Sequence, residues 1–145
     1  VSFIPPTNPN AVRGLRMIYE NGIELIHEDF GRGWAVRFIG TEGRLDVSRS
    51  FIETTPSSIL NAGEKTTKID YNDQGNHYQN WLDAIKSRQQ PICDVEVGHR
   101  SASLCHIANI TYELNRPLQW NPEKERFKAD FQANKMRKRK NRKYV

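Results

Sequence analysis

The stretch of residues 77–127 constrains the fold of this chain most, because it predicts two helices joined by a rigid connector. Asn76 and Gln79 form a start that resembles a capping box, after which apolar residues recur at helical spacing. These residues are Tyr78, Trp81, Leu82 and Ile85. Pro91 ends the first helix, since proline disfavours helical backbone in the residue before it, and Asp94 can cap the next helix.

The second helix is expected at about residues 95–115, and its apolar side chains span a wide arc. They are Leu104, Cys105, Ile107, Ala108, Ile110, Tyr112 and Leu114. An arc of this width predicts burial from more than one side. Beyond this helix we expect a short strand and then a further helix, with Asn121 as its cap and Pro122 at its first position. Glu123 and Glu125 would lie in the first turn, where the helix dipole favours acids.

Strands are predicted before these helices. Asn21-Gly22, between the segments VRGLRMIYE and IELIHE, predicts a tight hairpin. WAVRFIG and RLDVSR, joined through Thr41-Glu42-Gly43, predict a second hairpin, and FIETT and KTTKIDY are expected to add strands. Residues 1–11, rich in Pro and Asn, are expected to form a lead-in or edge segment. Because strands and helices are segregated, the predicted class is α+β, with an open, mainly antiparallel β-sheet and helices packed on one face.

The two faces of this predicted sheet differ in composition. One face is apolar and can pack against the two helices; it comprises Leu15, Met17, Tyr19, Ile23, Leu25, Trp34, Val36, Phe38, Leu45 and Val47. The other face carries Ile18, Ile26 and Ile39 among charged residues. A solvated face normally alternates more cleanly. Either another chain covers the second face, or these are ordinary surface isoleucines.

The positive charge of the chain is concentrated at its C-terminal end. The formal net charge is +5, and residues 135–145 contain seven Lys or Arg and no acid, which leaves 15 basic against 17 acidic residues elsewhere. We therefore expect one α+β domain over residues 1–134 and a basic tail over residues 135–145. Such a tail is either a nucleic-acid arm or a solvated extension that pairs with acids of a missing domain or a partner subunit. The lack of an accompanying nucleic-acid motif favours the extension.

Cysteine use and hydropathy restrict the remaining classes. Cys93 and Cys105 are 12 residues apart and form neither a redox pair nor a metal knuckle, so we expect buried, reduced thiols. No apolar run reaches the roughly 20 residues of a membrane-spanning helix, so no membrane partner is expected. The start at Val1, with Met17 and Met136 as the methionines, indicates a piece of a longer protein. The compartment is therefore left open.

A dinucleotide site needs a glycine-rich turn between a strand and a helix. The candidate in this sequence is Gly31-Arg32-Gly33, which runs into the predicted strand WAVRF and lacks a third glycine. We therefore expect no cofactor-binding residue in this chain.

Four polar residues of the second predicted helix form one stripe within about an 80° arc. They are His99, His106, Asn109 and Glu113. The two histidines lie about 10.5 Å apart along the axis, too far to share an ion, so no metal site is predicted. The stripe is either a wall of a substrate cleft, with His99 and Arg100 contacting substrate hydroxyls, or a solvated face with a hydrogen-bonded structural histidine. His27 lies within a predicted strand and has no evident partner in the sequence.

Several motifs resemble the C-terminal part of the Gfo/Idh/MocA oxidoreductase family, in particular its bacterial branch with long C-terminal tails. They are HYQNWLDAIKSRQQPICDVEVGHRSA, LNRPLQW and NPEKERF, and IGTEGRLDVSR resembles the sheet hairpin of that family. The resemblance covers roughly residues 13–134. Asn121 stands where members of that branch usually have Asp, and both residues cap a helix N-terminus well.

The resemblance implies the C-terminal domain of an NAD(P)-dependent oxidoreductase that acts on sugars or related polyols. NAD or NADP would bind to an upstream domain, which would also contain the catalytic Glu-Lys-Pro segment of the family. Gly63-Glu64-Lys65-Thr66 lacks that proline and is not given this role, so the catalytic residues are unknown. The chain would supply one wall of the substrate cleft and form a homo-oligomer through its open sheet face. The candidate substrate-binding residues are His99, Arg100, His106 and Asn109.

Two other function classes are kept as alternatives. The first is a stand-alone binding module whose basic tail engages nucleic acid or an acidic partner, and the second is a structural assembly domain. No nucleic-acid partner is expected under the leading interpretation, because the net positive charge is confined to the tail and no nucleic-acid motif accompanies it.

Overall fold

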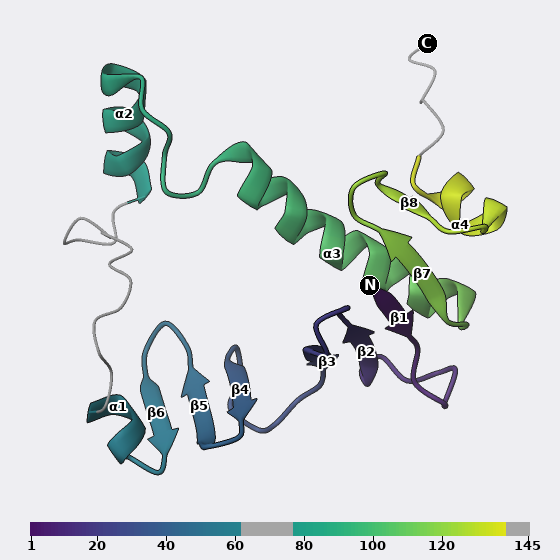
Figure 1. Ribbon diagram of the computed structural model, residues 1–145, viewed down its shortest axis with the longest axis horizontal. Helices are drawn as coiled ribbons and strands as arrows, with labels where there is room; N and C mark the ends of the chain where they lie inside the picture. The colour runs from purple at the N-terminus through teal and green to yellow at the C-terminus, as the bar shows by residue number, and fades with distance from the viewer. Residues whose placement is uncertain (62–76, 139–145) are drawn as a thin grey trace. The chain divides into compact units, whose positions relative to one another are not determined.

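The computed structural model describes residues 1–61 and 77–138 (Figure 1). The strands are β1 (Ser2–Ile4), β2 (Leu15–Ile18), β3 (Glu24–His27), β4 (Val36–Gly40), β5 (Gly43–Val47), β6 (Ile52–Thr55), β7 (Leu118–Asn121) and β8 (Arg126–Phe127). The helices are α1 (Ser58–Asn61), α2 (His77–Ser87), α3 (Val95–Leu114) and α4 (Phe131–Met136). Every strand pair in the described residues is antiparallel, which confirms the predicted α+β class.

The strands form two sheets, where the sequence suggested one. Five strands follow the order β3-β2-β1-β7-β8, and three follow the order β4-β5-β6. The chain likewise divides into two compact units, residues 1–29 with 95–145, and residues 30–94. The boundary between the units lies shortly after β3. Gly31 and Gly33, which follow this boundary, have φ values of 77° and 65°, outside the range of a strand. The boundaries 1–134 and 135–145 stay a prediction, although α4 continues across residue 134.

The central strand of the five-stranded sheet is β1, which the sequence placed in a lead-in or edge segment. Phe3 pairs with Met17 of β2 on one side and with Leu118 of β7 on the other. The edge assignment is therefore wrong for Ser2–Ile4. The strand has three residues, too few for a period-2 pattern to be recognised, and its β7 partner is more than 100 residues away.

The core of the first unit lies between this sheet, α3 and α4. Its buried side chains are Phe3, Leu15, Met17, Ile107, Ile110, Leu118, Phe127 and Ala133. α3 contacts both β1 and α4, so its C-terminal half is covered from more than one side, as predicted. Val95 and Val97 in its first turn are exposed. The helix ends at Leu114, and Asn115 follows with a φ of 46°, the left-handed conformation that commonly terminates helices.

A tyrosine–histidine contact ties α3 to the edge of the sheet. The backbone N–H of Leu15 donates to the Tyr112 hydroxyl at 3.1 Å, and this hydroxyl lies 2.9 Å from Nδ1 of His27. Because the tyrosine oxygen already accepts one hydrogen bond, its own proton is available for the imidazole. His27 thus has a partner 85 positions away in the chain, beyond the reach of local sequence patterns.

Replacing Tyr112 with phenylalanine is expected to lower the free energy of unfolding by about 1–2 kcal/mol, because the Leu15 N–H loses its acceptor. Urea unfolding followed by circular dichroism measures the change. Tyr19→Phe is the matched control, since the hydroxyl of Tyr19 makes no hydrogen bond with another described residue, and it should change stability by less than about 0.5 kcal/mol. Equal losses in both variants would contradict a structural role for the Tyr112 hydroxyl.

The C-terminal segment of the first unit is held by one carboxylate. Asp130 caps α4 by accepting from the Ala133 N–H at 3.0 Å, and it also accepts from both terminal nitrogens of Arg116. The pKa of Asp130 is lowered to about 2, and the hydrogen bond from Arg116 is the largest cause, followed by the hydrogen bond from the Ala133 N–H. The carboxylate therefore stays ionised at neutral pH and keeps both contacts.

The three-stranded sheet has one apolar and one charged face. Val36, Phe38, Leu45, Val47 and Ile52 share the apolar face by register. On the other face Arg37 donates twice to buried Asp46, at 2.7 and 2.8 Å, and these hydrogen bonds are the main cause that lowers the pKa of Asp46.

The apolar face predicted to pack under the two helices is only partly buried. Leu15 and Met17 are in the core, as expected, whereas Ile23, Leu25, Trp34, Val36 and Phe38 are exposed. In α2 the apolar residues Tyr78, Trp81, Leu82 and Ile85 are exposed as well. A period-2 or helical pattern identifies an apolar face but not the element that covers it. The expected burial is therefore wrong for these residues.

The cysteines also differ from expectation. Both thiols are free, but Cys93 and Cys105 are exposed where burial was predicted. Cys105 lies about 160° around α3 from Ile107, so it faces away from the core.

Within the described residues no helix is long and apolar enough to cross a membrane. The predicted strand KTTKIDY lies outside the described residues.

Candidate functional site

The predicted site residues begin in the N-terminal half of α3, next to the turn between β7 and β8. The sequence suggested a helix after Asn121, but residues 122–125 form a turn that connects the two strands. The Asn121 side chain accepts from the Lys124 N–H at 2.8 Å, much as a helix cap would. Glu125 has a φ of 47°, which ends any helical continuation. The helix prediction at Pro122 is therefore wrong, although the capping contact exists.

Glu125 is the centre of a polar cluster in this turn. Its Oε1 lies 2.6 Å from Nε2 of His99 and 3.5 Å from Nη1 of Arg100, both on α3. Arg137 donates to the backbone carbonyl of Glu125. The hydrogen bond from His99 is the largest cause that lowers the pKa of the Glu125 carboxyl, and the charges of Arg100 and Arg137 add to it. Glu125 is thus a carboxylate at neutral pH. The stabilisation that its contacts with His99 and Arg100 provide is lost as the pH falls below the ordinary range of the glutamate pKa.

Arg100 is oriented by three contacts. Its Nε donates to Glu96 Oε1 at 2.7 Å, one helical turn earlier, and its Nη1 donates to the Pro122 carbonyl at 2.8 Å. The third contact is the 3.5 Å pair with Glu125. The guanidinium is nevertheless half exposed, so part of its donor set faces solvent. This cluster holds α3 against the β7–β8 turn and keeps polar groups at the surface.

The other stripe residues behave differently. His106, Asn109 and Glu113 are exposed on α3, and their side chains make no hydrogen bond or ion pair with another described residue. The structure therefore joins His99 and Arg100 in one cluster and leaves His106 and Asn109 as free polar side chains farther along the helix. The substrate-binding assignment of these four residues stays a prediction.

Sequence reasoning missed Glu125 and Arg137 as members of the cluster. The sequence pattern places Glu125 in the first turn of a helix and Arg137 in the basic tail. The contacts of Glu125 with His99 and with Arg137 depend instead on how the β7–β8 hairpin folds back over α3. The sequence signal for this contact is only that Glu125 follows His99 by 26 residues, and such a separation is neither a helical nor a strand spacing. The part of the predicted tail beyond residue 138 lies outside the described residues.

Among the described residues, the Gly31-Arg32-Gly33 loop does not have the form of a dinucleotide-binding turn. Gly31 and Gly33 precede β4, so the turn between them leads into a strand, and a Cβ added to either glycine would meet nothing within 4 Å. A pyrophosphate cradle requires backbone N–H groups at a helix N-terminus and close packing at the glycines. The Gly63-Glu64-Lys65-Thr66 segment lies outside the described residues. In the described part of the chain, no three His, Cys, Asp or Glu side chains gather as metal ligands would.

A family of known proteins matches this chain. The family described as "Oxidoreductase family, C-terminal alpha/beta domain" matches residues 5–145, which is nearly the whole chain. No curated protein and no solved structure matches the chain.

Proposed function

This chain belongs to the Gfo/Idh/MocA oxidoreductase family, as its C-terminal alpha/beta domain, and we propose that it forms the substrate-cleft and oligomerisation domain of an NAD(P)-dependent dehydrogenase. The family match over residues 5–145 is the observation that carries this proposal. The substrate class would be sugars or related polyols. NAD or NADP would bind to a separate nucleotide-binding domain encoded upstream, and the hydride chemistry would belong to that cofactor.

The cluster around Glu125 supports a role for α3 as a cleft wall. The Glu125 carboxylate accepts a hydrogen bond from Nε2–H of His99, and in the tautomer with its proton on Nε2 the ring keeps Nδ1 as an acceptor for a substrate hydroxyl. Arg100 is held by acceptors on two elements and retains donors toward solvent. Such prior orientation lowers the entropy lost when a hydroxylated ligand binds. His106 and Asn109 would extend the wall with side chains that are free to form hydrogen bonds.

We expect His99→Ala and Arg100→Ala, in the protein that includes the upstream domain, to lower kcat/KM for the sugar substrate about 10- to 100-fold. The dissociation constant for NAD(P) should change less than about twofold, because these residues would touch substrate and not cofactor. Steady-state kinetics and cofactor titration measure the two quantities. Arg126→Ala is the matched control, since Arg126 is exposed on β8 beside the cluster. Unchanged kinetics in both His99→Ala and Arg100→Ala would contradict the cleft-wall role.

Exposed apolar residues on the sheets support the oligomerisation part of the proposal. Ile26 of β3 is 47% exposed on the face that also carries Arg16, Ile18 and Glu24, opposite the core side of the first sheet. Ile39 of β4 is 81% exposed, but it belongs to the second sheet. The apolar face of that second sheet is exposed as well. Contiguous apolar surface of this kind commonly marks a protein interface.

We expect the chain to self-associate as a dimer or larger oligomer at micromolar concentration. A standard interface buries about 1,600 Å² in total, which the exposed sheet surfaces can supply. Light scattering coupled to gel filtration measures the mass, and Ile26→Lys and Ile39→Lys should each shift the equilibrium toward monomer. Val12→Lys, at an exposed loop position, is the control for an added charge. A clean monomer at about 100 µM would argue strongly against this interface.

A further inference from the structure

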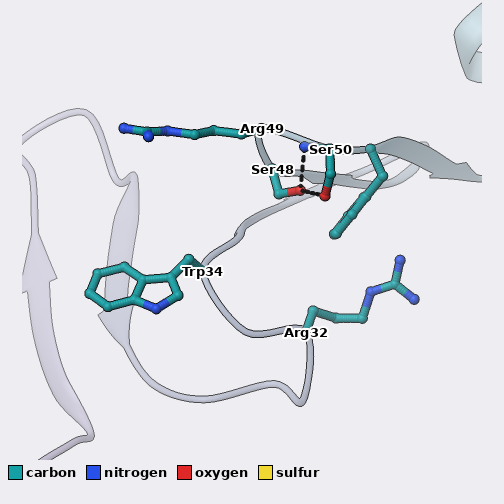
Figure 2. A pocket seen from close by; sticks show the side chains of 6 residues that line it. Arg32, Trp34, Ser48, Arg49 and Ser50 are labelled. Carbon is teal, nitrogen blue, oxygen red and sulfur yellow. Dashed lines mark hydrogen bonds between the residues drawn. The ribbon is translucent and has the colours of Figure 1, made fainter.

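The second unit contains an open hollow at one end of its three-stranded sheet (Figure 2). Its volume is about 490 Å³, and its lining residues are Arg32, Trp34, Ser48, Arg49, Ser50 and Phe51. Residues 48–51 connect β5 to β6, while Arg32 and Trp34 precede β4. No carboxylate is among the lining residues.

The connection from β5 to β6 is a tight turn that brings two hydroxyl groups together. The Ser48 N–H donates to the Phe51 carbonyl at 2.9 Å and closes the turn. The Ser50 N–H donates to the Ser48 hydroxyl, and the two serine hydroxyls lie 3.1 Å apart (Figure 2). Arg49 stands between the two serines. Its side chain projects from the turn on the same side of the view as Trp34 (Figure 2).

The two arginines of the hollow differ in their partners. Arg32 pairs with Glu53 at 2.6 Å and lies over the ring of Phe51, with its Cζ 4.5 Å from the ring centroid. Arg49 is exposed, and its side chain makes no ion pair or hydrogen bond with another described residue. A guanidinium presents a planar set of donors that matches the two oxygens of a carboxylate or phosphate. The free cation of Arg49 therefore favours an anionic group.

Trp34 adds a flat apolar surface. The residue is fully exposed, which is unusual for a tryptophan because the indole is large and apolar. An indole face can lie against the C–H groups of a sugar ring, whereas an inorganic anion would leave it uncovered. The combination of an unpaired arginine, two hydroxyls and an open indole therefore suits a hydroxylated ring that carries negative charge.

We propose that this hollow binds a sugar bearing a carboxylate or a phosphate group. Arg49 binds the anionic oxygens, the hydroxyls of Ser48 and Ser50 bind hydroxyl groups of the sugar, and the indole of Trp34 covers one face of its ring. The choice of a sugar rests on the proposed function, while the negative charge and the ring contact follow from the lining residues. The ligand class proposed for this hollow is thus acidic or phosphorylated sugars.

Calorimetric titration of the 145-residue chain with four probes tests this proposal. Glucuronate and glucose 6-phosphate should bind at least about tenfold more tightly than methyl glucoside, which lacks the charge, and than inorganic phosphate, which lacks the ring. The tighter of the two charged sugars identifies the preferred anionic group. Affinities of methyl glucoside and glucuronate within twofold of each other, or no binding of either charged sugar at about 10 mM, would overturn the proposal.

Variants assign the binding to the hollow. Arg49→Gln and Trp34→Ala should each weaken the charged sugars about tenfold or more, and Arg49→Lys should be intermediate because it keeps the charge but loses the planar donors. Arg88→Gln removes an exposed arginine of the same unit that does not line the hollow, so it should change affinity less than about twofold. All these side chains are exposed, so the variants are expected to fold. Unchanged affinity in Arg49→Gln would overturn the proposal. Since no cofactor takes part, failure here leaves the NAD(P) experiment on the proposed function unaffected.

Discussion

Replacing Phe127 with alanine is expected to reduce the free energy of unfolding by about 3–5 kcal/mol. The side chain is completely buried, and its ring contacts Trp120 edge to face with the centroids 5.1 Å apart. It belongs to the core cluster that joins the sheet to α3 and α4. The truncation removes this apolar contact and leaves a cavity whose lining cannot fully collapse. A loss of this size is a large part of the stability of a small domain.

Phe131→Ala is the matched control for this experiment. Phe131 stands four positions later, at the start of α4, and is 85% exposed, so its removal should cost less than about 0.5 kcal/mol. Urea unfolding of both variants, followed by far-UV circular dichroism, gives the two values. Similar losses at the two positions would contradict the packing of residues 126–136 on the core of the first unit.

The sequence predicted the elements that have strong local signals. The Asn21-Gly22 hairpin is confirmed, with the Tyr19 N–H donating to the Ile23 carbonyl at 2.9 Å and Gly22 at a φ of 84°. The two long helices begin and end within a few residues of their predicted bounds, because periodicity and Pro91 are read from neighbouring residues. The predicted cap at Asn76 lies outside the described residues.

Pairings between distant segments could not be predicted in the same way. β1 has no sequence pattern of its own, and its central place results from contacts with β2 and with the much later β7. The same limit explains the missing partner of His27, which is Tyr112. Alternation identified Val36 and Phe38 as one apolar face, but no local pattern states which element covers it.

The candidate site shows the same division between local and distant information. The helical spacing placed His99, His106 and Asn109 on one helix, as the structure has them. It could not indicate that Glu125 and Arg137 reach the same end of α3, since those contacts depend on the β7–β8 turn. The structure therefore adds the second half of the cluster and changes His99 from an isolated stripe residue into one with a fixed hydrogen-bond partner.

The largest expected functional effect concerns cofactor binding. We expect the 145-residue chain alone to show no appreciable affinity for NAD(P) and no oxidation of any sugar. The glycines of the Gly31-Arg32-Gly33 loop lead into β4, so this loop does not offer the pyrophosphate the positive end of a helix dipole. Joining the chain to the proposed upstream domain should restore both properties, because that domain would contain the glycine-rich turn after a strand and before a helix.

Calorimetric titration of NAD(P)H into the chain alone and into the longer protein tests the central claim most directly. The proposed function predicts that the longer protein binds NAD(P)H with micromolar affinity. Removal of the upstream domain should weaken this affinity by at least about 100-fold. The same pair of proteins should differ in sugar-dependent reduction of NAD(P), measured by absorbance. Micromolar affinity of the 145 residues alone would contradict the assignment, as would an upstream coding region without a strand, a glycine-rich turn and a helix.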